Sequence, residues 1–167
     1  MPSPPLRIAI LECDTPAPAT DSKYKGYGGV FTSLLRTAAA SKSLSNPTDA
    51  SESPLELELT AYDVVNAQTY PSLSSVDAIL LSGSKHNSFD NDEWILKLVE
   101  FTKQALEDER VRVIGVCFGH QIVGRALGVE VGRSEGGWEV SVTPLKLTAK
   151  GQEIFGQTTL VSCIYFL

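Results

Sequence analysis

The chain has 167 residues, which is enough for one domain with a sizeable hydrophobic core. Hydrophobic residues make up 43% of it and charged residues 20%, a composition that excludes an intrinsically disordered protein. The net charge of −6, without a basic cluster or a long apolar run, argues against a broad surface for nucleic acid or for membranes.

The first elements that the sequence predicts are a strand and a helix joined by a long loop. Residues 6–11 (L-R-I-A-I-L) form an apolar run that is typical of a buried strand. Residues 12–29 are rich in Pro, Thr, Asp and Gly, which predicts a loop that ends in a glycine-rich turn. The apolar side chains that follow share one face of a helix: Val30, Phe31, Leu34, Leu35 and Ala38.

The middle of the chain predicts an insertion, two strands and a helix. Residues 39–54 are small, polar and proline-containing, which indicates a flexible surface insertion. Residues 55–62 alternate as L-E-L-E-L-T-A-Y, the pattern of a half-exposed strand near a sheet edge. Residues 77–82 predict a buried strand that runs into Gly83. Residues 90–107 predict a helix, and their first residues, D-N-D-E, resemble a capping box.

The next stretch, residues 112–128, predicts a strand, a sharp turn and an amphipathic helix. Gly115 and Gly119 remove side chains where strand and helix crowd together, and Cys117 lies between them. This is the cysteine form of the nucleophile elbow, in which the N–H of Phe118 is placed to stabilise an oxyanion. The alternative for Cys117 is a buried cysteine at the end of a strand.

Strands that alternate with helices predict the fold class. The pattern favours an α/β fold with an open, mostly parallel, flavodoxin-like sheet and flanking helices. Residues 139–147 alternate between polar and apolar, so we expect antiparallel strands there. Ligands bind at the carboxyl ends of parallel strands, so we expect the 12–29 loop, the Gly83 turn and the Cys117 elbow to share one edge.

Three motifs give the chain a resemblance to a known family. They are L-L-S-G-S-K-H at residues 80–86, G-V-C-F-G-H-Q at residues 115–121 and G-R-S-E-G-G-W-E at residues 132–139. Together they resemble the class I glutamine amidotransferases, and in particular the stand-alone branch with plant gamma-glutamyl peptidases and fungal amidotransferase-like proteins. The resemblance implies a single amidotransferase domain over residues 1–167 whose C-terminal strands are incomplete.

The resemblance also implies a reaction and its residues. The protein would hydrolyse glutamine or a gamma-glutamyl amide through a thioester on Cys117, supplying nitrogen or processing a gamma-glutamyl intermediate in metabolism. No cofactor or metal is implied, and a synthetase partner is compatible with it. The oxyanion donors would come from Phe118 and from the turn at Gly83 and Ser84, while Gln121 would contact the substrate. Taken alone, Gly83 is also typical of a strand-end turn and Gln121 of a helix surface.

The general base is where this sequence departs from the family. The family uses a histidine in a downstream His-Pro-Glu motif, whereas no histidine follows His120 here. The other histidine is His86, and each of the two is either a base or a residue satisfied by local hydrogen bonds. We therefore expect a chain that is C-terminally truncated relative to the family and has little or no glutaminase activity.

Two other functions stay open at this point. The first is a catalytically incomplete remnant that binds a metabolite or a protein. The second is a cysteine-dependent redox or chaperone protein of another family, which places a histidine directly after its cysteine, where this chain has Phe118. In the third motif, Trp138 is predicted either to wall the substrate pocket or to pack in the core.

The cysteines and the N-terminus predict a location. Cys13, Cys117 and Cys163 are widely spaced and form no C-x-x-C motif, which suits a reducing compartment and argues against a disulfide scaffold or a zinc site. The first residues lack the apolar region of a signal peptide. We therefore expect a cytoplasmic protein in which Cys13 and Cys163 are packing residues.

Overall fold

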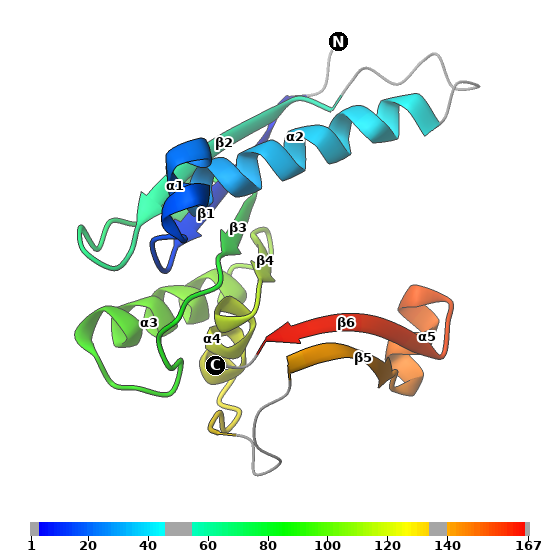
Figure 1. Cartoon of the computed structure of the whole chain (residues 1–167). Helices are drawn as coiled ribbons and strands as arrows, with labels where there is room; N and C mark the ends of the chain where they lie inside the picture. The colour runs from blue at the N-terminus through cyan, green and yellow to red at the C-terminus, as the bar shows by residue number, and fades with distance from the viewer. Residues whose placement is uncertain (1–3, 46–54, 134–139, 166–167) are drawn as a thin grey trace. The chain divides into compact units, whose positions relative to one another are not determined.

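The structure, a computed structural model, describes residues 4–45, 55–133 and 140–165. The chain divides into two compact units, Met1–Val131 and Gly132–Leu167, whose elements are labelled in Figure 1. The single amidotransferase domain over residues 1–167 stays a prediction.

A parallel four-stranded sheet forms the centre of the first unit. Its strand order is β2-β1-β3-β4. The strands are β1 (Leu6–Glu12), β2 (Leu57–Asp63), β3 (Ala78–Leu81) and β4 (Arg112–Gly115). As the alternating pattern predicts, β2 lies at an edge of this sheet and is half-exposed. The predicted α/β fold with a flavodoxin-like parallel sheet is confirmed.

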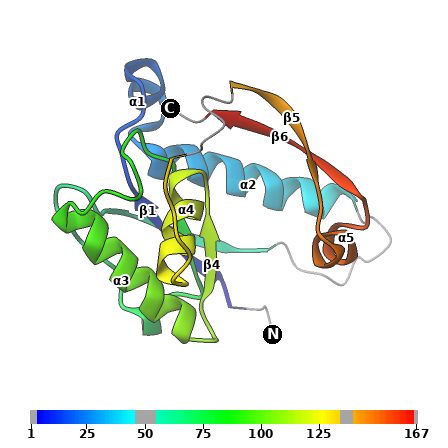
Figure 2. The ribbon, with the colours of Figure 1, turned by 90° about the horizontal axis from the view of Figure 1, so that it is seen from below.

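Helices connect these strands and cover both faces of the sheet. They are α1 (Pro18–Tyr24), α2 (Tyr27–Ser45), α3 (Glu93–Glu107) and α4 (Phe118–Ala126), with a short 3₁₀ turn η1 (Leu73–Ser75) before β3. Figures 1 and 2 both show α3 beside α4. No helix within the described residues is long and apolar enough to cross a membrane.

Alternation along β1 divides the core into two layers. Ile8 and Ile10 face the layer that contains Phe31 and Leu35 of α2. Successive side chains of a strand point to opposite faces, so Ala9 and its alternate neighbours face the other layer. That layer holds the buried side chains of α3 and α4, including Trp94, Ile95, Leu98, Phe118 and Ile122.

The loop predicted over residues 12–29 needs correction, because it contains α1 and the start of α2. Pro18 occupies the first turn of α1, where its fixed φ suits a helix and its missing N–H costs nothing. The turn between the helices is made by Lys25 and Gly26, with φ of 60° and 108°. The remaining glycines of the run lie inside α2. Gly29 permits close packing, since a Cβ there would lie 1.7 Å from the carbonyl oxygen of Tyr24.

Two further boundaries differ from the sequence prediction. Helix α2 continues to Ser45, into the insertion predicted over residues 39–54, because residues 38–40 are alanines and favour a helix. The predicted capping box is wrong: α3 begins at Glu93, and its N-cap Asp92 makes no side-chain cap bond. Asp90 instead accepts a hydrogen bond from Nδ2 of Asn87 at 3.0 Å.

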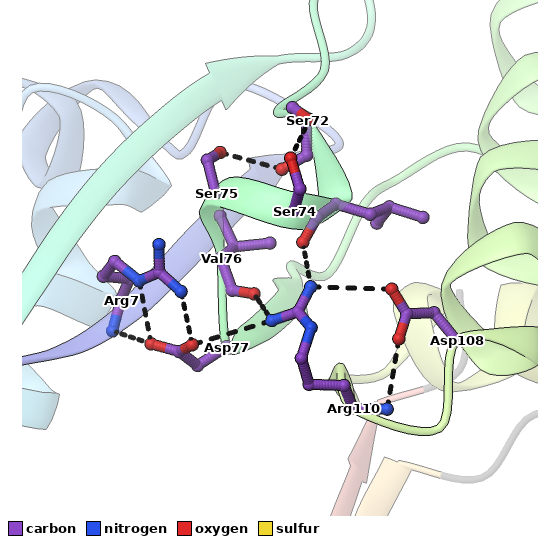
Figure 3. Close-up of polar contacts among 9 residues, drawn as sticks. Arg7, Ser72, Ser74, Ser75, Val76, Asp77, Asp108 and Arg110 are labelled. Carbon is purple, nitrogen blue, oxygen red and sulfur yellow. Dashed lines mark hydrogen bonds and ion pairs between the residues drawn. The ribbon is translucent and has the colours of Figure 1, made fainter.

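An ion pair joins the amino ends of β1 and β3. Oδ2 of Asp77 accepts hydrogen bonds from the backbone N–H and Nε of Arg7 at 2.9 and 3.1 Å, and Oδ1 accepts one from its terminal nitrogen at 2.7 Å. Figure 3 shows Arg110 beside the same carboxylate, where it also donates to the carbonyl of Val76 at 2.6 Å. The hydrogen bonds from Arg7 lower the pKa of Asp77 to about 2.

The second unit is an antiparallel strand pair with a helix between the strands. It consists of β5 (Val140–Lys146), α5 (Ala149–Phe155) and β6 (Thr159–Tyr165). The antiparallel pattern predicted for residues 139–147 is confirmed in β5. Helix α5 was not predicted, although its end signals are present: Oγ1 of Thr148 accepts the N–H of Gly151 at 3.2 Å, and Gly156 closes the helix with φ of 66°.

Candidate active site

Cys117 lies in the sharp turn between β4 and α4. Its φ of 53° and ψ of −109° fall in a region that residues other than glycine rarely adopt. The residue is exposed and stands at the N-terminus of α4. A strained residue in a strand-to-helix turn is typical of a nucleophile elbow, so the backbone has the geometry that the sequence predicts.

Two glycines let the strand and the helix approach each other. A Cβ on Gly115 would lie 2.6 Å from the carbonyl carbon and oxygen of Gly119, and a Cβ on Gly119 would lie 2.6 Å from the Cβ of Leu81. Neither position has room for a side chain. The crowding that the sequence predicts at these glycines is confirmed.

Backbone donors lie next to the cysteine. A Cβ on Gly83 would lie 3.7 Å from the Cβ of Cys117, so the turn after β3 approaches the elbow closely. The N–H groups of Gly83, Ser84 and Phe118 have no acceptor within the part of the chain that the structure describes. Free N–H groups of this kind are what an oxyanion requires. The structure thus brings the predicted donors to the same place as Cys117, and their role stays a prediction.

The loop after β1 reaches the same edge through residues that the sequence analysis did not single out. Oδ2 of Asp14 accepts the backbone N–H of Lys85 at 2.8 Å. Burial raises the pKa of Tyr27, and the charges of Asp14 and Cys117 raise it further. The only signal in the sequence for Asp14 is its position just after the first strand.

Gln121 lies one turn along α4 from the cysteine. Its backbone N–H donates to the carbonyl of Cys117 at 3.2 Å, and its side-chain Oε1 accepts a hydrogen bond from Oγ of the buried Ser88 at 2.8 Å. This bond orients the amide. Within the described residues its Nε2 has no acceptor, and it is free to donate to a ligand.

In the described part of the chain, the two histidines form no hydrogen-bonded dyad with the cysteine. The ring of His86 packs edge-on against Trp94, with centroids 5.3 Å apart, and Trp94 stacks on Phe118. His120 is exposed on α4. Within the described residues neither ring hydrogen-bonds Cys117.

Of the other residues that the sequence analysis named, Cys13 lies within the described residues, whereas Trp138 and the side chain of Cys163 do not. Cys13 is fully buried, and burial raises the pKa of its thiol to about 12, which agrees with a packing residue. Trp138 and the rest of its G-W-E motif lie outside the described residues, and the side chain of Cys163 is not described.

A pocket of about 290 Å³ lies at the carboxyl ends of β1 and β2 and beside the turn after β3. Lys85 and His86 line it and continue directly from the turn that carries Gly83 and Ser84. Its other charged lining residues are Glu12, Asp14, Asp21, Lys25 and Asp63. The pocket is therefore polar, carries both signs of charge and borders the candidate oxyanion donors.

Comparisons with a family model and with individual proteins point to the same family. The family described as glutamine amidotransferase class-I matches residues 41–162. A putative glutamine amidotransferase-like protein of Schizosaccharomyces pombe is 34% identical over 154 residues, covering 92% of this chain and 60% of the relative. A putative glutamine amidotransferase of Saccharomyces cerevisiae is 41% identical over 123 residues, covering 65% of this chain and 49% of the relative.

A plant relative belongs to the same group. Gamma-glutamyl peptidase 4 of Arabidopsis thaliana is 33% identical over 137 residues, covering 80% of this chain and 48% of the relative. The chain thus spans about half to three fifths of the length of these relatives. The family match covers most of the chain and agrees with the parallel sheet and the elbow at Cys117. The chain belongs to the class I glutamine amidotransferase family.

Proposed function

We propose that this protein cleaves glutamine or a gamma-glutamyl amide with Cys117 as the nucleophile. The observation that carries the proposal is the exposed Cys117 in a strained turn, beside the free N–H groups of Phe118 and of the Gly83 turn. A thiolate is the nucleophilic form of cysteine, and a helix N-terminus favours negative charge.

In the proposed reaction the Cys117 sulfur attacks the carboxamide carbon of the substrate. The carbonyl oxygen becomes an oxyanion, which accepts hydrogen bonds from the N–H of Phe118 and from the turn at Gly83 and Ser84. Collapse breaks the C–N bond, and the leaving nitrogen takes from solvent the equivalent of the proton that the Cys117 thiol released, departing as ammonia or an amine. Water then hydrolyses the gamma-glutamyl thioester, so the chemistry requires no cofactor. Gln121 would donate its Nε2 to the bound substrate.

The family and the relatives named gamma-glutamyl peptidase support the substrate class. Within that class we propose that the protein acts in the cytoplasm on a small gamma-glutamyl compound. A synthetase that receives the ammonia is a further proposal, compatible with the amidotransferase names of the fungal relatives.

The test is ammonia release from glutamine and amine release from gamma-glutamyl peptides. Protonation of the leaving nitrogen by a positioned acid typically contributes about 10²–10⁴-fold, and in the described part of the chain neither histidine ring hydrogen-bonds Cys117. We therefore expect slow turnover by the 167-residue chain and faster turnover when it is extended with the C-terminal part of a longer relative. Loss of the faster turnover in Cys117→Ala would support the nucleophile, whereas retention would overturn it. Robust turnover by the unextended chain that His86→Ala abolishes would make His86 the base.

A second candidate is a binding protein that retains the fold without turnover. The observation that favours it is that neither histidine ring hydrogen-bonds Cys117 within the described residues. Calorimetry with glutamine and with a gamma-glutamyl dipeptide separates the two candidates. Binding without turnover in both the 167-residue chain and the extended chain would favour the binding protein.

A further inference from the structure

We infer that Asp14 and Ser82 are positioning residues that hold the turn after β3 so that its free N–H groups face Cys117. The inference rests on the proposed function, because it assigns these N–H groups to an oxyanion. It assigns a role to two residues outside the elbow. One of them, Asp14, lies in the loop after β1, distant in sequence from the turn after β3.

The register of the sheet brings these residues together. Strands β1 and β3 are parallel, and Leu11 pairs with Leu81. The residues that follow each strand therefore meet at the same edge. Asp14 reaches the turn there although it is 71 positions from Lys85 in the chain.

Asp14 binds the far half of the turn through its carboxylate. Oδ2 accepts the backbone N–H of Lys85 at 2.8 Å and lies 3.5 Å from the donating Oγ of Ser84, and Oδ1 accepts Nζ of Lys85 at 2.9 Å. The backbone N–H of Thr15 fixes the carboxylate from its own loop at 2.7 Å. The Asp14 side chain is only 8% exposed, and these partners satisfy its charge.

Ser82 binds the near half of the turn. Its buried hydroxyl accepts the backbone N–H of Cys13 at 2.9 Å and donates to the carbonyl of Gly83 at 2.9 Å. In a trans peptide the C=O and the N–H point in opposite directions. Holding the Gly83 carbonyl therefore directs the N–H of Ser84 away from Ser82, and holding the Lys85 N–H with Asp14 fixes the next peptide.

Charge balance explains why Asp14 forms an ion pair with Lys85. A bare carboxylate near a developing oxyanion would oppose it, since like charges repel. The Lys85 ammonium forms an ion pair with Asp14 at 2.9 Å and offsets that charge.

The test compares two alkylating reagents at Cys117 in the 167-residue chain. One is the chloroketone analogue of glutamine, in which CH₂Cl replaces the amide NH₂ and whose ketone oxygen becomes an oxyanion when the thiolate adds. The other is iodoacetamide, which is displaced at its CH₂ and forms no oxyanion. The readout is the ratio of the two rate constants at Cys117, measured by mass spectrometry of the labelled peptide.

We expect the wild-type ratio to exceed that of free cysteine, and Asp14→Ala to lower it at least about tenfold, since losing one oxyanion donor typically costs about 10²–10³ in rate. Asp14→Asn keeps an oxygen for the Lys85 N–H and should lose less. Asp77→Asn is the matched control: it changes the carboxylate that joins β1 and β3 at their other ends, and it should leave the ratio unchanged.

Each outcome decides between the two ideas. A wild-type ratio no higher than that of free cysteine overturns the proposed function and this inference with it. A high wild-type ratio that Asp14→Ala leaves unchanged, or that Asp77→Asn lowers as much, overturns the inference alone. If Cys13 becomes labelled in Asp14→Ala, the fold is lost, and Asp14→Asn with Ser82→Ala then decides: an unchanged ratio in both overturns the inference, and a fall in either supports it.

Discussion

Gly119 of α4 lies against Leu81 of β3 so closely that a Cβ on the glycine would be 2.6 Å from both the Cβ and the carbonyl oxygen of the leucine. Leu81 is also the last residue of β3 and precedes the turn that carries Gly83. The contact therefore sets the distance between the N-terminus of α4 and that turn. The position of Cys117 depends on it.

The first prediction concerns this contact. Gly119→Ala should lower the free energy of unfolding by roughly 1–3 kcal/mol, because overpacking outweighs the better helix propensity of alanine. Urea denaturation measures the change. Gly132→Ala is the control, since a Cβ there meets nothing within 4 Å. A Gly119→Ala protein as stable as the wild type would show that α4 does not pack on β3 as described.

The second prediction concerns the thiols. Cys117 should react with iodoacetamide faster than Cys13 and Cys163 at neutral pH. It is exposed at the start of α4, whereas burial raises the pKa of Cys13 to about 12 and leaves its thiol protonated. Peptide mapping after brief labelling gives the three rates, and Cys117→Ala is the control. Faster labelling of Cys13 than of Cys117 would contradict the nucleophile elbow.

The third prediction concerns the pH dependence of stability. The pKa of Asp77 falls from an ordinary value of 3.8 to about 2 on folding, because Arg7 stabilises the carboxylate. A lowered folded pKa means that the ion pair stabilises the protein fully above the ordinary pKa and stops doing so as pH falls through the folded value. Asp77→Asn should therefore destabilise the protein at pH 7, and the difference should shrink between about pH 4 and pH 2.

Urea denaturation at several pH values measures this difference. Asp92→Asn is a suitable control, since the side chain of Asp92 makes no cap bond at the start of α3. A difference between wild type and Asp77→Asn that stays constant down to pH 2 would show that the Asp77 carboxylate contributes nothing through its charge.

The fourth prediction concerns Gln121. Gln121→Ala should slow labelling of Cys117 by the chloroketone analogue of glutamine at least several-fold while leaving iodoacetamide labelling unchanged, because the amide is proposed to bind the substrate. Ser88→Ala removes the hydrogen bond to Oε1 at 2.8 Å and should have a smaller effect of the same kind. Equal slowing of both reagents would mean that Gln121 only supports the helix.

Much of the fold followed from local patterns. The apolar runs of β1 and β3, the alternation in β2 and the glycines around Cys117 predict their elements correctly, because each pattern lies within a few consecutive residues. Helix α1 was missed because most of its residues are also common in loops, and α5 because seven residues are too few to show a helical apolar period. The end of α2 was misplaced because its last residues are small and polar, typical of an insertion, whereas the alanines at 38–40 favour a continuing helix.

The sequence by itself determined the family, the parallel sheet and the sharp turn at Cys117, since these depend on motifs and on periodicity along the chain. Only the tertiary structure decided which distant polar groups meet: Asp14 with Lys85, Ser82 with Cys13, and Arg7 with Asp77. The physical reason is register. Pairing Leu11 with Leu81 aligns residues about 70 positions apart at both ends of the strands, and no local pattern contains that information.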